Sequence, residues 1–216
     1  MAGRRGDEPD AVTTGAHDRA RLRRVALRLE YATIAWNLGE AFLTIGLGIA
    51  AGSLALVGFG TDSVIEMFAS AVVVWHVRPG HEVDRTERTR LALRLVALAF
   101  LALAVVLATV AIRDLVIGRR AEESPFGIAY LAVTAVVMFG LAMAKRRVAG
   151  RLGSAPLRSE AAMTFLDGIL SVLTLTGLAL NAALGWWWAD PAAALLVAVA
   201  AANEARENRA EANELA

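Results

Sequence analysis

Six long apolar segments, joined by short polar connections, constrain this chain more than any other feature. They cover roughly residues 25–51, 54–77, 91–117, 126–144, 161–184 and 187–202. Most are long enough to cross a bilayer as a helix, which takes about 20 apolar residues at a rise of about 1.5 Å each. Core helices of a soluble protein would carry a charged face along each turn, and these segments do not. The sequence therefore predicts an all-α membrane protein, a bundle of six transmembrane helices.

The positions of Lys and Arg predict the orientation of this bundle. Of the 22 basic residues, 19 lie near the N-terminus, around the connections after the second and fourth segments, or in the C-terminal tail. Arg113, Arg119 and Arg120 lie on the opposite side. Because basic residues stay on the cytoplasmic side, we expect both termini in the cytoplasm and the protein in the plasma (inner) membrane. The three consecutive Trp residues at 186–188 fit an outer turn at the membrane surface.

Charge and composition exclude several functions. The net charge of +1 gives no reason to expect a nucleic-acid partner. The absence of Cys rules out disulfides, thiolate metal sites and Cys nucleophiles. The apolar segments also lack an HExxH-like pair, so we expect no enzyme and no prosthetic group. We expect a mobile cytoplasmic tail over residues 1–24, one transport domain over 25–203, and a short polar cytoplasmic tail over 204–216.

Four acidic residues lie well inside the apolar segments, namely Glu40, Asp62, Glu66 and Asp167. An ionised acid at the centre of a membrane helix costs roughly 2.5–3.5 kcal/mol on insertion scales. Away from the ends of the segments we find no Lys or Arg that could pair with these acids. They must therefore be protonated or compensated by something outside the chain, and a bound cation is the simplest candidate.

The helical positions of these acids suggest one shared site. Asp62 and Glu66 are four residues apart, so they lie on one face of the second segment. Polar stripes run along two other segments: Thr33, Asn37, Glu40 and Thr44 in the first, and Glu160, Thr164, Asp167, Ser171 and Thr174 in the fifth. The first, second and fifth segments should line a hydrated interior, with the third and fourth packed outside it. Ser, Thr and Asn can also simply join helices by hydrogen bonds, and Glu40 could accept a hydrogen bond or carry a proton instead of binding metal.

The stretch SLALVGFGTDSVIEM, residues 53–67, resembles the second span of the cation diffusion facilitator family. That family places two metal-binding residues four apart in this span, at positions that Asp62 and Glu66 occupy here. Its fifth span carries a second such pair; Asp167 matches the second member, while Met163 stands at the first. The connection GWWWADP, residues 185–191, also resembles the family's turn between spans five and six.

The resemblance implies a transmembrane transporter of divalent metals. It implies a transported dication, most commonly Zn²⁺, with Mn²⁺, Fe²⁺, Co²⁺ or Cd²⁺ as alternatives, and metal ligands from Asp62, Glu66, Met163 and Asp167. Asn37 and Glu40 are further candidates, and Met163 could instead pack in the core. The family's usual cytoplasmic metal-binding domain does not follow the spans here, so the closest resemblance is to a minimal six-span member.

A mechanism follows from the charges. Metal can bind carboxyl groups only by displacing their protons, so a site that opens to each side in turn would exchange metal for protons. We expect metal efflux from the cytoplasm by cation/proton antiport, with the lipid bilayer, divalent cations and protons as partners and a homodimer as an open question. Two alternatives stay open: a proton-coupled exporter of organic cations, and a non-transporting membrane scaffold derived from a transporter.

Overall fold

The computed structural model describes residues 8–50, 54–78, 85–118 and 125–215. Within these residues the chain forms helices only. There are six of them: α1 (Glu8–Ala50), α2 (Leu54–Val77), α3 (Arg85–Ile117), α4 (Pro125–Leu152), α5 (Ala155–Leu184) and α6 (Ala189–Glu214). The all-α, six-helix fold that the apolar segments predict is therefore confirmed.

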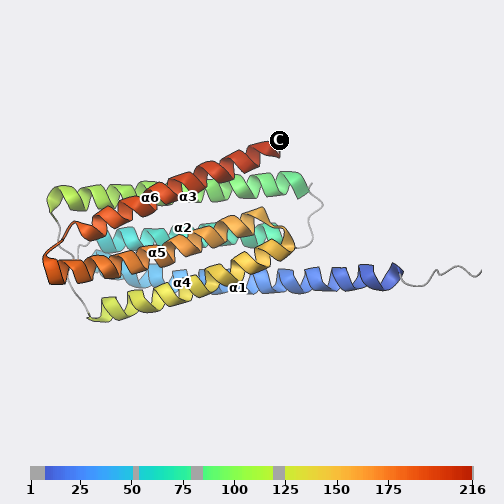
Figure 1. Ribbon diagram of the computed structural model, residues 1–216, viewed down its shortest axis with the longest axis horizontal. Helices are drawn as coiled ribbons and strands as arrows, with labels where there is room; N and C mark the ends of the chain where they lie inside the picture. The colour runs from blue at the N-terminus through green and yellow to red at the C-terminus, as the bar shows by residue number, and fades with distance from the viewer. Residues whose placement is uncertain (1–7, 51–53, 79–84, 119–124, 216) are drawn as a thin grey trace, which may run out of the picture.

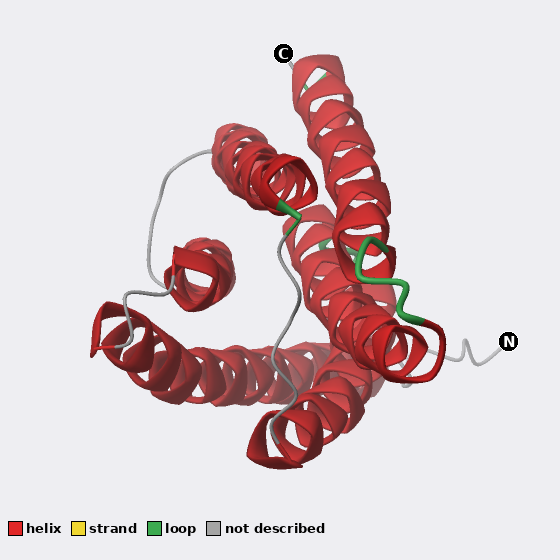
Figure 2. Cartoon of the chain, turned by 90° about the vertical axis from the view of Figure 1, so that its left-hand side faces the viewer, coloured by secondary structure: helices red, strands yellow, loops and turns green. Residues whose placement is uncertain are grey.

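The six helices run along one common direction, as Figure 1 shows from the side. The most extensive contacts join α3 to α6, α1 to α2 and α4 to α5. In the end-on view of Figure 2 the helices form a bundle without a sheet or a second domain among the described residues. The first and last helices begin and end, respectively, at the same end of the bundle (Figure 1).

Three helices are long and apolar enough to cross a membrane by length and composition, within the described residues. They lie at Thr86–Ile117, Ile128–Leu152 and Ala155–Leu184. Among the other helices, α2 is strongly apolar apart from Asp62 and Glu66, and the second half of α6 is rich in charged residues.

The N-terminal end of the described chain is more helical than the sequence predicts, and the C-terminal end is helical as well. Residues 8–24, which we expected in a mobile tail, belong to α1, and this helix extends beyond the rest of the bundle in Figure 1. Residues 1–7 lie outside the described part. At the other end, α6 continues without a break to Glu214. Both terminal segments are rich in charged residues and good helix formers such as Ala, Arg and Glu, so each continues the apolar helix that it adjoins.

Capping residues set the limits of α5. Ser154 has extended backbone angles, and its hydroxyl accepts a hydrogen bond from the backbone N–H of Leu157 at 3.4 Å. The helix ends at Gly185, whose φ of 70° is in the left-handed region that favours glycine. The N–H of Gly185 donates to the carbonyl of Asn181 at 2.9 Å. These two caps determine where α5 begins and ends.

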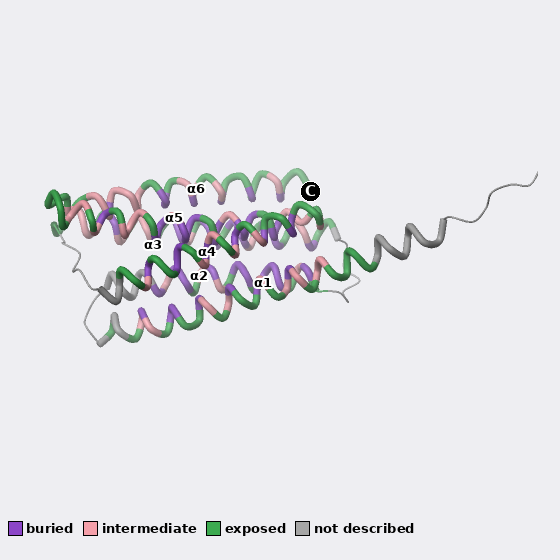
Figure 3. Tube along the Cα trace, turned by 60° about the horizontal axis from the view of Figure 1, so that its bottom comes forward, coloured by how far each residue is buried: buried purple, intermediate pink, exposed green. Residues whose placement is uncertain are grey.

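The bundle has an apolar core and a separate polar interior. The apolar core joins α2, α3, α5 and α6 around Phe100, Leu103 and Leu166, and Met163 belongs to it, with 1% of its surface exposed. The polar interior lies between α1, α2, α4 and α5, and Figure 3 shows buried positions along these helices. The structure thus places the side chain of Met163 among apolar side chains.

A glycine allows α1 and α2 to approach closely beside the acidic residues. A Cβ atom at Gly60 would lie 2.4 Å from Cγ1 of Ile45 and 2.6 Å from Oγ1 of Thr44. A larger residue there would force the side chains of Ile45 and Thr44, or α1 itself, to shift. This close contact lies only two residues before Asp62, so it holds the start of the acidic face of α2 against α1.

Candidate functional site

The four intramembrane acids that the sequence singles out are all buried in the bundle. Asp62 and Asp167 are each 7% exposed, and Glu40 and Glu66 are less exposed than that. They come from three helices: Glu40 from α1, Asp62 and Glu66 from α2, and Asp167 from α5. Asp167 interacts electrostatically with the other three. The sequence prediction that these acids face one another is therefore consistent with the fold.

The polar stripe on α1 also faces inward. Thr33, Asn37 and Thr44 are buried with Glu40. Each of these three side chains donates a hydrogen bond to a carbonyl one turn earlier in α1, as from Nδ2 of Asn37 to the carbonyl of Thr33 at 3.1 Å. Because these donors are used within α1, the amide oxygen of Asn37 is left to accept a contact from a group in the interior.

Two oxygens of the predicted ligand residues have no hydrogen-bond partner among the described residues. They are Oδ1 of Asn37 and Oδ2 of Asp167. A buried acceptor without a donor is costly, and most buried polar atoms in native proteins are paired. One is an amide oxygen and the other belongs to a carboxyl group, so when the carboxyl group is ionised both atoms can only accept hydrogen bonds. Among the described residues, unpaired groups that can donate also occur in the interior, at Nε1 of Trp36, Oγ1 of Thr134 and Oγ of Ser171.

The carboxyl group of Glu40 contacts a side chain of α4, a helix that the sequence does not predict to line the site. The hydroxyl of Tyr130, on α4, donates to Oε1 of Glu40 at 2.9 Å. The ring of Tyr130 stacks on that of Trp36 from α1, with ring centroids 6.4 Å apart. Glu40 is therefore oriented by α4 and has a partner of its own, which distinguishes it from Asp167.

The acids share one region without forming a coordination sphere. In the part of the chain that the structure describes, no three or more Asp, Glu or His side chains converge as they would around a metal ion. The helices bring the acids together, while the side chains stay apart. Assembly of a metal site here requires side-chain rotation, helix movement or both.

A second buried polar cluster lies beside these acids, and its centre is a lysine. Nζ of Lys145, on α4, lies 2.6 Å from Oε1 and 2.7 Å from Oε2 of Glu160 on α5. It also lies 3.4 Å from Oε2 of Glu30 on α1. All three side chains are 0% exposed. This cluster, Glu30, Lys145 and Glu160, is called the lysine cluster below.

Two hydroxyl groups connect the lysine cluster to α2. Ser70 donates to Oε1 of Glu160 at 2.8 Å. Oγ1 of Thr164 lies 3.1 Å from Nζ of Lys145, which donates to it, and 2.7 Å from Oε1 of Glu66. The hydroxyl has one proton and Glu66 is the nearer acceptor, because Oε1 of Glu160 lies at 3.3 Å. Thr164 thus accepts from Lys145 and donates to Glu66.

These contacts correct two expectations. No basic residue was expected near the acids, because Lys145 comes directly after the fourth apolar segment; its ammonium is nevertheless buried, pairs with Glu30 and Glu160, and interacts electrostatically with Glu66. The fourth helix was expected outside the polar interior, yet α4 supplies both Lys145 and Tyr130 to it. The third helix contributes to the apolar core instead.

The comparison with known protein families agrees with this arrangement. The profile of the cation efflux transmembrane domain matches residues 31–211, which is most of the chain. The chain belongs to the cation efflux family. The matched region includes all six residues that the sequence nominated as metal ligands, and no curated protein matches the chain significantly. This cation efflux protein is accordingly an integral membrane cation transporter, and the match gives no support for an enzyme.

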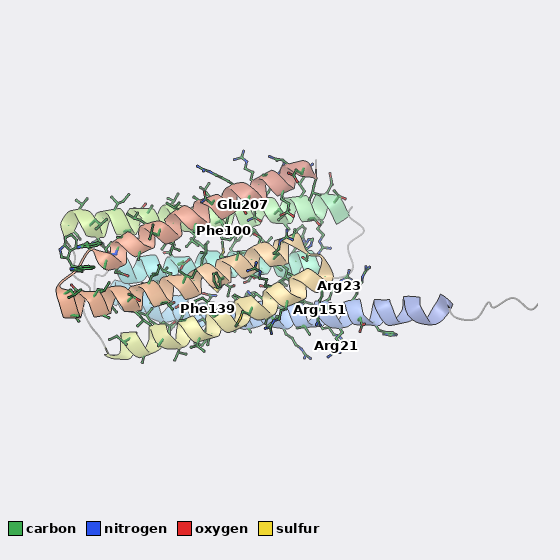
Figure 4. The ribbon with its side chains drawn as sticks, viewed as in Figure 1. Arg21, Arg23, Phe100, Phe139, Arg151 and Glu207 are labelled. Atoms are coloured by element: carbon green, nitrogen blue, oxygen red, sulfur yellow. The ribbon has the colours of Figure 1, made fainter. Side chains whose placement is uncertain are left out.

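Basic residues gather at one end of this cation efflux protein. Arg21, Arg23 and Arg151 lie at the end of the bundle from which α1 extends (Figure 4). The connection between α4 and α5 lies at the same end, as Figure 1 shows. Because Lys145 and Glu160 flank that connection in sequence, the lysine cluster lies on this side of the acidic residues.

Proposed function

We propose that this protein exports a divalent metal from the cytoplasm in exchange for protons, through a site formed by Asp62, Glu66 and Asp167. Glu40 and Asn37 complete the set of oxygens around it. The basic end of the bundle faces the cytoplasm under the rule that positive residues stay inside. Both termini are then cytoplasmic and the membrane is the plasma (inner) membrane.

The observation that supports this proposal is the gathering of buried carboxyl groups. Four carboxyl groups from three helices share one interior region, and Oδ2 of Asp167 and Oδ1 of Asn37 find no donor among the described residues. Protons on the carboxyl groups would supply hydrogen-bond donors, and a bound dication would supply positive charge. Either can occupy the region, and each excludes the other because metal binding releases protons.

The donor atoms favour a hard metal ion. Met163 lies in the apolar core, so the remaining candidate ligands are all oxygen atoms. Carboxylate and carbonyl oxygens suit Mn²⁺ and similar ions, whereas protein zinc sites rely on His and Cys. We therefore propose Mn²⁺ as the first ion to test, with Zn²⁺, Fe²⁺, Co²⁺ and Cd²⁺ beside it.

The test is uptake of metal into proteoliposomes that have an acidic interior and a neutral exterior. Protein reconstituted with its cytoplasmic face outward should accumulate Mn²⁺ while the gradient lasts and should stop when an ionophore dissipates it. D62N and D167N should each abolish uptake, since each removes a charge while keeping the side-chain size.

The matched control is D114N. Asp114 lies near the end of α3, pairs with Arg113 at 3.1 Å, and belongs to a helix that supplies no acid to the site. This variant should transport like the parent protein. Uptake by D62N at the parental rate would remove the carboxylate site from the mechanism, and gradient-independent uptake would remove the protons. An absence of dication uptake by folded protein would favour an organic-cation exporter or a scaffold.

A further inference from the structure

The lysine cluster has the composition of a second metal site whose cation is part of the protein. Its carboxylates come from α1 and α5, and Ser70 and Thr164 add hydroxyl oxygens from α2 and α5. Every one of these side chains is 0% exposed. Oxygen atoms of two acids and two hydroxyls are the donors that a hard dication prefers, and here an ammonium group lies among them.

The contacts of Glu30 show that the ammonium group of Lys145 interacts less closely with Glu30 than with Glu160. Glu160 receives Lys145 at 2.6 and 2.7 Å on its two oxygens, whereas the closest approach to Glu30 is 3.4 Å. Neither oxygen of Glu30 has a hydrogen-bond partner within the described residues. With all three groups ionised the cluster has a net charge of −1. Without the lysine it would have −2, the charge that one dication neutralises.

The cluster also lies between the basic end of the bundle and the proposed transport site. Glu160 and Asp167 are seven residues apart on one face of α5, which is about 10 Å along the helix. Thr164 lies between them and joins Lys145 to Glu66. An ion that moves between the basic end of the bundle and Asp167 along this face must pass the two acids, which could retain it.

We propose that Lys145 is a tethered cation that occupies a second metal site, formed by Glu30 and Glu160, and so restricts metal binding to the carboxylates around Asp62. A transport path must bind its ion weakly enough to release it, and a pair of vacant buried acids would trap a dication. Lys145 removes that trap. It also orients the hydroxyl of Thr164 toward Glu66, which makes it a positioning residue for the transport site. This inference rests on the proposed function.

The experiment counts Mn²⁺ ions bound per chain in detergent-purified protein, by equilibrium dialysis with the free ion measured by its paramagnetic resonance signal. The parent protein should bind one Mn²⁺. K145Q should bind two, because the vacated acids take up a second ion. K145R, which keeps the positive charge, should bind one. K145Q/E160Q should also return to one, because only a single acid then remains in the cluster.

The outcomes separate the inference from the function on which it rests. No Mn²⁺ bound to the parent protein would contradict Mn²⁺ binding at the transport site, while a gain of one ion in K145Q relative to the parent would still support the second site. Equal numbers of ions in the parent and K145Q would overturn the tethered cation. A gain that persists in K145Q/E160Q would overturn the assignment to Glu160.

K145Q could fail to fold without metal, and a second variant covers that case. K145A leaves space for a small amine, so folded protein should be recovered when cells or membranes are extracted in n-propylammonium chloride. Extraction in n-propanol, which has the same carbon chain without the charge, should not recover it. Equal recovery in both would contradict the proposal, because filling of the space would then suffice.

Discussion

Removal of the Lys145 ammonium should destabilise this cation efflux protein far more than removal of an exposed basic residue. The variant K145M keeps a long, flexible side chain and deletes the charge. The ammonium contacts both oxygens of Glu160 and lies near Glu30, and all three side chains are fully buried. Loss of one partner from such a buried ion pair leaves an uncompensated charge, which costs about 3–5 kcal/mol.

The chain provides a control of nearly the same geometry at the surface. Nη2 of Arg158 lies 3.0 Å from Oε1 of Glu211, but these side chains are 61% and 41% exposed. Such a pair contributes about 0–1 kcal/mol, because water solvates both charges when they separate. R158M should therefore lower the free energy of unfolding by no more than about 1 kcal/mol.

The assay is unfolding in mixed micelles by increasing SDS, followed by Trp fluorescence, with EDTA present so that no dication replaces the ammonium. The triple variant K145M/E30Q/E160Q should regain most of the lost stability, since apolar or neutral replacement of a whole buried ion pair is often neutral or stabilising. If K145M and R158M lose the same free energy, the ammonium is hydrated and the buried network does not hold the bundle together.

Three further perturbations test other contacts. T164V removes the hydroxyl that donates to Glu66 at 2.7 Å. The Mn²⁺ affinity measured by equilibrium dialysis should fall about 10–100-fold, as it does when a hydrogen-bond partner of a metal ligand is lost. The control is T176V on the same helix, whose hydroxyl donates to the carbonyl of Val172; it should bind Mn²⁺ like the parent protein. G60A should lower the free energy of unfolding by about 1–3 kcal/mol through overpacking against α1. G39A, with nothing within 4 Å of its Cβ, should leave the free energy of unfolding equal or raise it by up to about 1 kcal/mol. Equal changes in the two variants would show that α1 moves to accept the added methyl group at little cost. M163L should cost less than about 1.5 kcal/mol and leave Mn²⁺ uptake unchanged, and a loss of uptake in correctly inserted protein would restore Met163 as a ligand.

The sequence predicts the helices and the acidic residues well, because both depend on local patterns. Each apolar segment corresponds to one helix, and the four-residue spacing of Asp62 and Glu66 already places them on one face of α2. The inward direction of the α1 stripe follows from the same periodicity. The contribution of α4 could not be predicted this way, because its apolar residues show no preferred face and its two polar contacts are single side chains.

The role of Lys145 depends on the length and direction of its side chain, which the position of the residue in the sequence does not reveal. Lys145 is the first residue after an apolar segment, so its sequence position places it at the membrane surface, where lysines usually extend toward water. Here the flexible side chain turns inward, because two acids at the same depth require compensation. One sequence signal does exist. Glu30 stands seven residues before Asn37, and Glu160 stands seven before Asp167, so each of these two helices carries an acid two turns from the site. The helix between α1 and α5 is α4, which packs on both. Two acids at this depth need a cation between them, and Lys145, directly after the fourth apolar segment, is the basic residue of α4 nearest to this depth.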